Sequence, residues 1–182
     1  MQTTGRIVCV ARHGEHAFSK RLCQQITLLA GRGIEGDAHC GETVKHRSRV
    51  AVNPNQPNLR QVHLIAEELF EELTPKGFSV TPGDLGENIT TRGIDLLSLP
   101  LGTKLKMGPQ VVLELTGLRN PCKQIDAFQN GLMQAVLGRD EAGAITLRAG
   151  VMAIVVCGGL VQPGDEICVD LPPMPYKRLE RV

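Results

Sequence analysis

Short β-branched runs, separated by turns rich in glycine and proline, constrain the fold of this chain more than any other feature of its sequence. The runs occupy residues 5–12, 25–30, 62–65, 89–91, 104–107, 111–116, 150–156 and 166–170. The 182 residues include 20 glycines and 11 prolines, many of which lie between these runs. Short apolar runs bounded by turn residues are typical of strands. The sequence therefore predicts a mainly β domain.

Two segments show a helical pattern. Residues 66–73 place three apolar side chains on one face, and a proline and a glycine follow to end the helix. Residues 120–137 repeat apolar side chains at helical spacing, although Gly131 interrupts the pattern. Two modest helices beside many short strands favour a β-barrel with a few short helices over a doubly wound sheet.

The length of the chain fits one domain. A chain of this size buries roughly 70% of its unfolded surface, so a single core is sufficient. We expect one domain over residues 1–171. The tail, residues 172–182, contains three prolines and a basic end. This composition predicts an extended, loosely packed appendage.

Charge and aromatic content argue against a nucleic-acid partner. Twenty basic and nineteen acidic residues give a formal net charge of +1, whereas duplex-binding domains are strongly basic. One Tyr, four Phe and no Trp are too few aromatic rings to stack single-stranded bases. No segment reaches the ~18 apolar residues of a membrane span, and the N-terminus does not resemble a secretory signal. We expect a cytoplasmic protein that binds neither nucleic acid nor a membrane.

The cysteines do not form a disulfide or zinc framework. Six are scattered along the chain without a Cys-x-x-Cys pair: Cys9, Cys23, Cys40, Cys122, Cys157 and Cys168. A cytoplasmic chain of this length does not need disulfides for stability, so we expect all six to be reduced. Cys9, Cys157 and Cys168 lie in strand-like stretches, which predicts that they are small core residues.

A glycine pattern at residues 31–36 (GRGIEG) is similar to the fingerprint of a dinucleotide-binding fold. That fingerprint follows a strand, opens a helix and precedes an acidic residue about 20 positions later. The next residues, DAHCG, do not open a helix well, and a loop rich in Asn and Pro takes the place of the acidic residue. We therefore exclude a dinucleotide site.

The same glycine-rich region contains two further sets of candidate ligands. The first set consists of four competent zinc ligands: Asp37, His39, Cys40 and His46. Their spacing matches no established zinc site. We therefore expect Asp37 to bind the backbone of a turn and His39 to donate to a carbonyl. The second set consists of three basic residues: Lys45, Arg47 and Arg49. These could clamp an anion such as phosphate, or could form a solvated loop face.

Cys122 differs from the other cysteines in its local sequence. An Asn followed by a Pro indicates a helix start, with Asn120 as the cap and Pro121 in the first turn. Free backbone N–H groups would then surround Cys122. The helix dipole and the flanking Arg119 and Lys123 should lower the pKa of the thiol. Such a thiolate can serve as a nucleophile, a sulfur carrier or a soft-metal ligand, and the alternative is a cysteine packed under the helix start.

Five elements of the chain, in order, resemble the MOSC family, which is named for the C-terminal domain of molybdenum cofactor sulfurases. They are residues 33–39 (GIEGDAH), 82–89 (PGDLGENI), 119–122 (RNPC), 149–152 (AGVM) and 161–165 (VQPGD). The resemblance covers about residues 20–171, and the order and spacing of the elements make it specific. It implies a compact MOSC-type β-barrel similar to the pyruvate kinase barrel.

The resemblance also implies the functional residues. Cys122 would be the catalytic residue and would either ligate molybdenum in a bound molybdopterin or carry sulfur as a persulfide. The implied cofactor-binding residues around the thiol are Asp37, His39, Glu87, Asn88, Arg119 and Asn120. Lys20 and Arg47 are candidates for binding the phosphate of the cofactor. Relatives occur beside a pyridoxal phosphate-dependent desulfurase domain; this chain has no room for one, so pyridoxal phosphate would belong to a partner.

Three functions follow as hypotheses. The chain could bind the molybdenum cofactor through Cys122 and, with a reductase partner, take part in the reduction of N-hydroxylated compounds. It could instead accept a persulfide on Cys122 from a cysteine desulfurase and deliver the sulfur to a metal–sulfur cofactor. It could also be a non-catalytic binding module. The intact elements around Cys122 and around Glu87–Asn88 favour the first two functions over the third.

Overall fold

The computed structural model describes residues 4–182, without the side chains of residues 47 and 48. The strands of the barrel are β1 (Thr4–Arg12), β5 (Val62–Ala66), β6 (Ile89–Arg92), β7 (Lys104–Met107), β8 (Val111–Leu118), β11 (Val151–Cys157) and β13 (Glu166–Asp170). The other strands are β2 (Arg21–Cys23), β3 (Ile26–Leu29), β4 (Gly33–Ile34), β9 (Leu137–Arg139), β10 (Ile145–Leu147) and β12 (Gly159–Val161).

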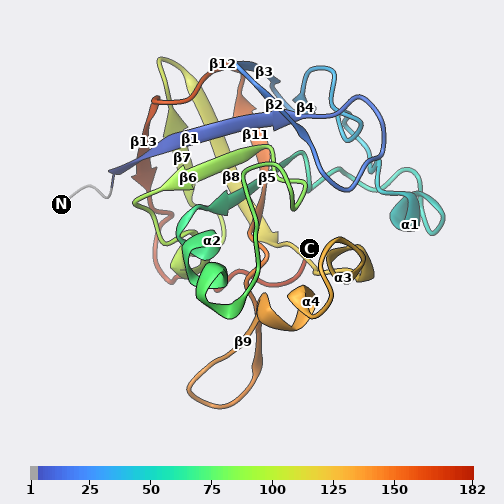
Figure 1. Cartoon of the computed structure of the whole chain (residues 1–182). Coiled ribbons are helices and arrows are strands. Elements are labelled where there is room, and N and C mark those ends of the chain that lie inside the picture. Colours follow the sequence, from blue (N-terminus) through green and yellow to red (C-terminus); the bar gives the residue numbers. More distant parts are fainter. Residues whose placement is uncertain (1–3) are drawn as a thin grey trace.

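A closed barrel of seven strands forms the centre of the molecule (Figure 1). The strand order is β13-β7-β8-β11-β5-β6-β1, and pairing of β1 with β13 closes the ring. Among the described strands of the barrel, every pair is antiparallel except β5 and β6. Closure leaves no free sheet edge in the ring. The predicted mainly β barrel with a few short helices is confirmed.

The barrel interior is filled by alternate side chains of its strands. In β8 each second residue is buried, so Val111, Leu113 and Leu115 point inward. Strand β5 differs because it is buried on both faces. Val62 and Leu64 enter the barrel core, while Ile65 packs into a second apolar cluster outside the barrel. This outer face of β5 supports the candidate site described below.

The helices are α1 (Arg47–Val50), α2 (Glu68–Leu73), α3 (Lys123–Phe128) and α4 (Leu132–Ala135), with short 3-10 helices η1 (Thr74–Lys76) and η2 (Leu96–Ser98). Helices α2, α3 and α4 cover the outer face of β5. The predicted helix at 66–73 is present as α2, and its apolar residues pack against those of α3 and α4. No helix among the described residues is long and apolar enough to cross a membrane.

The single helix predicted for residues 120–137 is wrong. The segment forms α3 and α4, with Gly131 between them at a φ of 83°. This left-handed backbone conformation cannot continue an α-helix, and glycine adopts it without steric cost. The first helix also begins later than predicted, at Lys123, with Cys122 instead of Asn120 as its N-cap.

The prediction of a loosely packed tail is wrong at its end. Leu179 is 8% exposed and belongs to the barrel core. Arg181 forms a β-bridge with Leu118, at the end of β8. Strand β7 pairs with β8 only as far as Glu114, so the end of β8 has backbone groups without a strand partner on that side. The tail supplies those partners.

The six cysteines are free. The prediction that Cys9, Cys157 and Cys168 are core residues is wrong, because none of them belongs to a buried apolar cluster. Cys157 is exposed at the end of β11. Cys9 and Cys168 are half-buried because their side chains lie on the outer face of the barrel, on β1 and β13.

Candidate functional site

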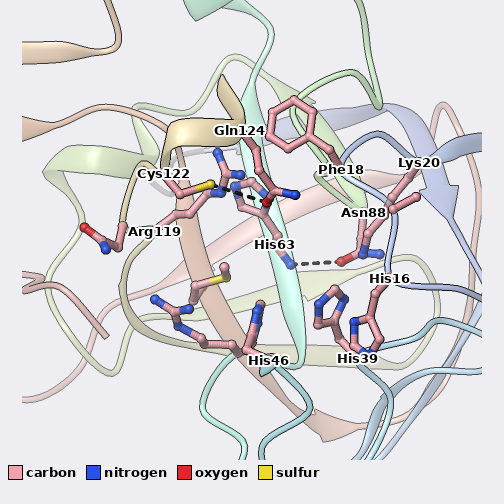
Figure 2. A pocket seen from close by; sticks show the side chains of 15 residues that line it. His16, Phe18, Lys20, His39, His46, His63, Asn88, Arg119, Cys122 and Gln124 are labelled. Atoms are coloured by element: carbon pink, nitrogen blue, oxygen red, sulfur yellow. Dashed lines mark hydrogen bonds between the residues drawn. The ribbon is translucent and has the colours of Figure 1, made fainter. Parts of the chain in front are cut away.

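A cavity of about 390 Å³ opens over the outer face of β5 and the end of β8 (Figure 2). This volume lies in the range of ordinary small-molecule sites. Its lining comes from the loop after β1, the long segment between β4 and β5, strand β5, the turn before β6, the segment from the end of β8 to the start of α3, and strand β11. Residues far apart in sequence therefore meet around one space.

The carboxylate of Asp37 organises one side of the cavity. Its Oδ2 accepts from Lys20 Nζ at 2.8 Å and from Asn88 Nδ2 at 3.0 Å. Its Oδ1 accepts from the backbone N–H of His39 at 3.0 Å and lies 3.3 Å from His39 Nδ1. Burial favours the neutral acid, but the hydrogen bonds from His39 and the charge of Lys20 hold the pKa of Asp37 well below its usual range. Asp37 is therefore an ionised anchor behind the cavity wall.

Lys20 and Asp37 form a buried ion pair. Their side chains are 5% and 2% exposed. Burial lowers the pKa of Lys20 from its ordinary value, although Asp37 opposes that effect. Lys20 lines the cavity, whereas Asp37 does not. The buried carboxylate of Asp37 therefore holds the ammonium group of Lys20 in place at the cavity wall.

Asn88 joins three segments beneath the cavity. Its Nδ2 donates to the carbonyl of Ala11 at 3.1 Å as well as to Asp37, and its Oδ1 accepts from the backbone N–H of His63 at 3.1 Å. The ring of His63 is buried, with Nε2 at 2.8 Å from the carbonyl of Ala149. Since a carbonyl only accepts, we assign the ring proton to Nε2. Burial lowers the pKa of His63 well below its ordinary value, so the ring is neutral.

Glu87 and Arg119 are ionisable side chains with incomplete hydrogen bonding. Glu87 is 0% exposed, and its Oε1 accepts from the backbone N–H of Gly83 at 2.6 Å. Burial raises the pKa of Glu87 and lowers that of Arg119. Among the described residues, neither Glu87 Oε2 nor Arg119 Nη1 has a hydrogen-bond partner, and both atoms are buried. Because Arg119 lines the cavity, an anionic ligand could satisfy its free donor.

Cys122 lines the same cavity and is half-buried. Its backbone is extended, and its carbonyl accepts the first helical hydrogen bond of α3 from Ile125 at 3.0 Å. The Sγ atom lies 3.5 Å from Gln124 Oε1 (Figure 2). Lys123, the second flanking cation in the sequence argument, is exposed and lies outside the cavity lining. Among the described side chains, the Lys and Arg residues that line the cavity are Lys20, Arg60 and Arg119.

Three histidines form the wall across from Cys122 and Gln124 (Figure 2). The rings of His16 and His39 lie 5.1 Å apart in an edge-on arrangement, and those of His39 and His46 lie 4.3 Å apart. Burial, together with the neighbouring His39, lowers the pKa of His46 to about 3. In the part of the chain that the structure describes, no cluster of His, Cys, Asp or Glu could hold a metal ion. Asp37 accepts from the backbone N–H of His39, as the turn interpretation predicted, but the ring of His39 lies against Asp37 Oδ1 and not against a carbonyl.

Comparison with known families gives a clear result. The model for the MOSC domain matches residues 39–168. This chain belongs to the MOSC domain family.

Solved structures share the fold of this MOSC domain. The YuaD protein from Bacillus subtilis is 25% identical, with a TM-score of 0.75 over 95% of this chain and 99% of that one. YiiM from Escherichia coli is 16% identical, with a TM-score of 0.62 over 94% of this chain and 73% of that one. YiiM from Geobacillus stearothermophilus is 16% identical, with a TM-score of 0.60 over 97% and 78%. No match was found among curated proteins.

The MOSC fold brings most of the predicted site residues together. Those that line the cavity are Lys20, His39, Asn88, Arg119, Asn120 and Cys122. Asp37 and Glu87 lie behind the wall and act on it through hydrogen bonds or charge. The side chain of Arg47 lies outside the described residues.

Sequence reasoning missed several lining residues of this MOSC domain. They are His16, Phe18, Arg60, His63 and Gln124. A polar His63 inside the apolar run VHLI was a usable signal, because a histidine there must find a partner when the strand is buried. Arg60 follows a loop rich in Asn and Pro, and nothing in the local sequence indicates where that loop leads.

Proposed function

We propose that this MOSC domain binds the molybdenum cofactor in the cavity, with Cys122 as the protein ligand to molybdenum, as a component of the reduction of N-hydroxylated compounds. One observation carries the proposal. A half-buried thiol shares a cavity with three cations, and one of these cations has a buried donor without an acceptor among the described residues.

The residues present fit an anionic pterin cofactor. Its phosphate carries about two negative charges at neutral pH, which matches the cations Lys20, Arg60 and Arg119. The free Nη1 of Arg119 requires an acceptor that the cofactor's oxygens can supply. A cysteine thiolate is a soft ligand suited to a metal centre rich in sulfur. A cavity of about 390 Å³ is large enough for a small-molecule ligand.

The cofactor, when bound, would supply the two electrons that, together with two protons from solvent, convert an N-hydroxylated compound to an amine and water. The protein residues would bind and orient the cofactor. Arg119 and Lys20 would neutralise the anion, with Lys20 held in place by Asp37. Since a carboxylate only accepts, His39 carries its proton on Nδ1 toward Asp37 and leaves Nε2 able to accept a proton. The helices outside the barrel would limit the access of water to Cys122.

Metal analysis of freshly isolated protein tests the proposal. Protein from cells with intact cofactor synthesis should contain molybdenum, and the Cys122→Ser variant should lose it. Cys157→Ser is the matched control, because Cys157 is exposed at the end of β11, outside the cavity lining. Wild-type protein without molybdenum under these conditions would contradict the proposal.

A second candidate function is supported by the position of the cysteines. Among the described residues that line the cavity, Cys122 is the one cysteine, so no lining thiol could attack a persulfide on its Sγ, form a disulfide and release hydrogen sulfide. In this function, the Cys122 thiolate attacks the terminal sulfur of a persulfide on a cysteine desulfurase, and the donor thiolate leaves. Mass spectrometry after incubation with such a donor should detect one added sulfur, and the addition should be absent in Cys122→Ala.

A further inference from the structure

We propose that Arg60 is a further anion-binding residue of the cavity and that residues 179–182, here called the C-terminal strap, hold its guanidinium beside Cys122. The inference rests on the proposed function, because it assigns Arg60 to the oxyanion groups of the same ligand. It adds a binding residue and a distant segment that positions it.

The strap is fixed along the end of β8. Leu118 N donates to Glu180 O at 2.7 Å, and Val182 N donates to Leu118 O at 3.3 Å. The side chain of Leu179 is buried in the barrel core. A Cβ at Gly117 would lie 2.5 Å from Glu180 O, so glycine at this position allows the close approach of the strap. The strap is therefore held by backbone hydrogen bonds and by apolar packing.

The end of the strap binds Arg60. The main-chain oxygen of Val182 accepts from Arg60 Nε at 2.7 Å, and it also accepts from Arg60 Nη2. A guanidinium has five N–H donors, so two are used and three are left. No other hydrogen bond of the Arg60 side chain occurs among the described residues. The contact fixes the direction of a flexible side chain and leaves most of its donors available.

Arg60 lies at the cavity with Cys122 and Arg119. Burial lowers the pKa of Arg60 to about 10, an effect that Arg49, Arg119 and Arg181 increase and the charge of Cys122 opposes. The guanidinium groups of Arg60 and Arg119 therefore both add positive charge to the surroundings of Cys122 Sγ. An oxyanion such as a phosphate group accepts hydrogen bonds from arginine in a bidentate manner, which is the ligand chemistry that this arrangement suits. A side chain held in its bound orientation also loses less entropy when a ligand binds.

The test compares two reagents of similar size that alkylate Cys122, anionic iodoacetate and neutral iodoacetamide. Each reaction forms a carbon–sulfur bond and releases iodide, and each consumes the same thiolate. The ratio of the two rate constants therefore reports the positive charge near Sγ independently of the fraction ionised. Peptide mass spectrometry follows Cys122 separately from the other five cysteines, in protein without cofactor.

Arg60→Gln should lower the ratio of iodoacetate to iodoacetamide rates at least about threefold at low salt, because a nearby cation attracts the anionic reagent. Deletion of Val182 should lower the ratio in the same direction, since Arg60 loses its acceptor. Gly117→Ala is a second strap variant that keeps every atom of Arg60 and of the strap. Its new methyl group displaces Glu180, so the ratio should fall in this variant too. Thermal unfolding followed by circular dichroism establishes which variants are folded.

Lys123→Gln is the matched control. It removes a cation adjacent in sequence to Cys122 but exposed and outside the cavity lining, so the ratio should change much less than in Arg60→Gln. An Arg60→Gln ratio equal to that of this control overturns the assignment of Arg60. The role of the strap is overturned if the folded Val182-deleted and Gly117→Ala proteins keep the wild-type ratio of rate constants while Arg60→Gln lowers it. None of these outcomes depends on molybdenum, so failure of the proposed function would be seen separately in the metal analysis.

Discussion

The two walls of the cavity are built in different ways. The barrel wall, which contains His63, Arg119 and Met152, is attached to strands β5, β8 and β11, whose backbones pair with one another. The histidine wall, which contains His39 and His46, is attached to the long segment between β4 and β5. Strand pairing fixes the first wall, whereas isolated hydrogen bonds fix the second. The positions of Arg119 and His63 are therefore set by the fold itself, and those of the histidines by a few contacts that single substitutions can remove.

Asp37 connects the two walls. It binds His39 on one side and Asn88 on the other, and it neutralises the buried charge of Lys20. The two walls are therefore coupled through one carboxylate.

Removal of this carboxylate should have the largest effect on stability. Asp37→Ala leaves Lys20 buried without its counter-ion, and breaking a buried ion pair from one side costs about 3–5 kcal/mol. Urea unfolding at neutral pH measures the loss. The double variant Asp37→Leu with Lys20→Met should lose less, because both charges are removed together. Equal losses in the two proteins would mean that the ion pair is not the link between the walls.

Substitution of Asn58 should have the next largest effect on stability, and it affects the histidine wall alone. Its buried Nδ2 donates to the carbonyls of His39 at 2.9 Å and Gly41 at 3.0 Å. Asn58→Ala leaves these acceptors without a partner, at a cost of about 1–3 kcal/mol. Hydrogen exchange should increase in the segment between β4 and β5 and stay unchanged in β5, β8 and β11. A uniform increase over both regions would remove the distinction between the walls.

Substitution of His46 should have the smallest effect on the free energy of unfolding at neutral pH and a larger effect in acid. Burial lowers the pKa of folded His46 to about 3, below the ordinary value near 6.5. Between these two pH values the unfolded chain binds the proton and the folded chain does not, so stability falls as the pH falls from about 6.5 toward 3. His46→Gln should make the plot of unfolding free energy against pH less steep in that window and leave stability near pH 7 little changed.

The matched comparison for His46 is His63 on the barrel wall. Burial also lowers the pKa of His63, so it contributes a slope of the same sign. Denaturant unfolding at several pH values, with wild type and His46→Gln side by side, separates the two contributions. An unchanged slope in His46→Gln would assign the whole acid sensitivity to other groups.

The sequence was a good guide where a pattern is repeated locally. The alternation in β7 and β8 matches their buried and exposed faces, and the five family elements indicated the barrel. Cys122 was placed at a helix start, although the helix begins at Lys123. The error arose because Pro121 was assigned to the first turn, whereas the chain remains extended through Cys122.

The parts of the site and of the tail that were not predicted depend on long-range contacts, which local sequence patterns do not encode. Arg60 reaches the cavity from the end of a loop, and its hydrogen-bond partner Val182 is 122 residues away. Glu87 was placed with the cavity residues, but its side chain points under the turn to Gly83. The prolines in the tail gave no information about the unpaired end of β8 that the tail covers.

Closure of the barrel by β1 and β13 has a consequence for synthesis on the ribosome. Thr4 to Arg6 pair with Glu166 to Cys168, so this edge of β1 has no partner until β13 has been translated. Contacts of such large sequence separation form slowly, because much of the chain must be ordered before they can be made. The ring cannot be completed in a nascent chain that stops before β13.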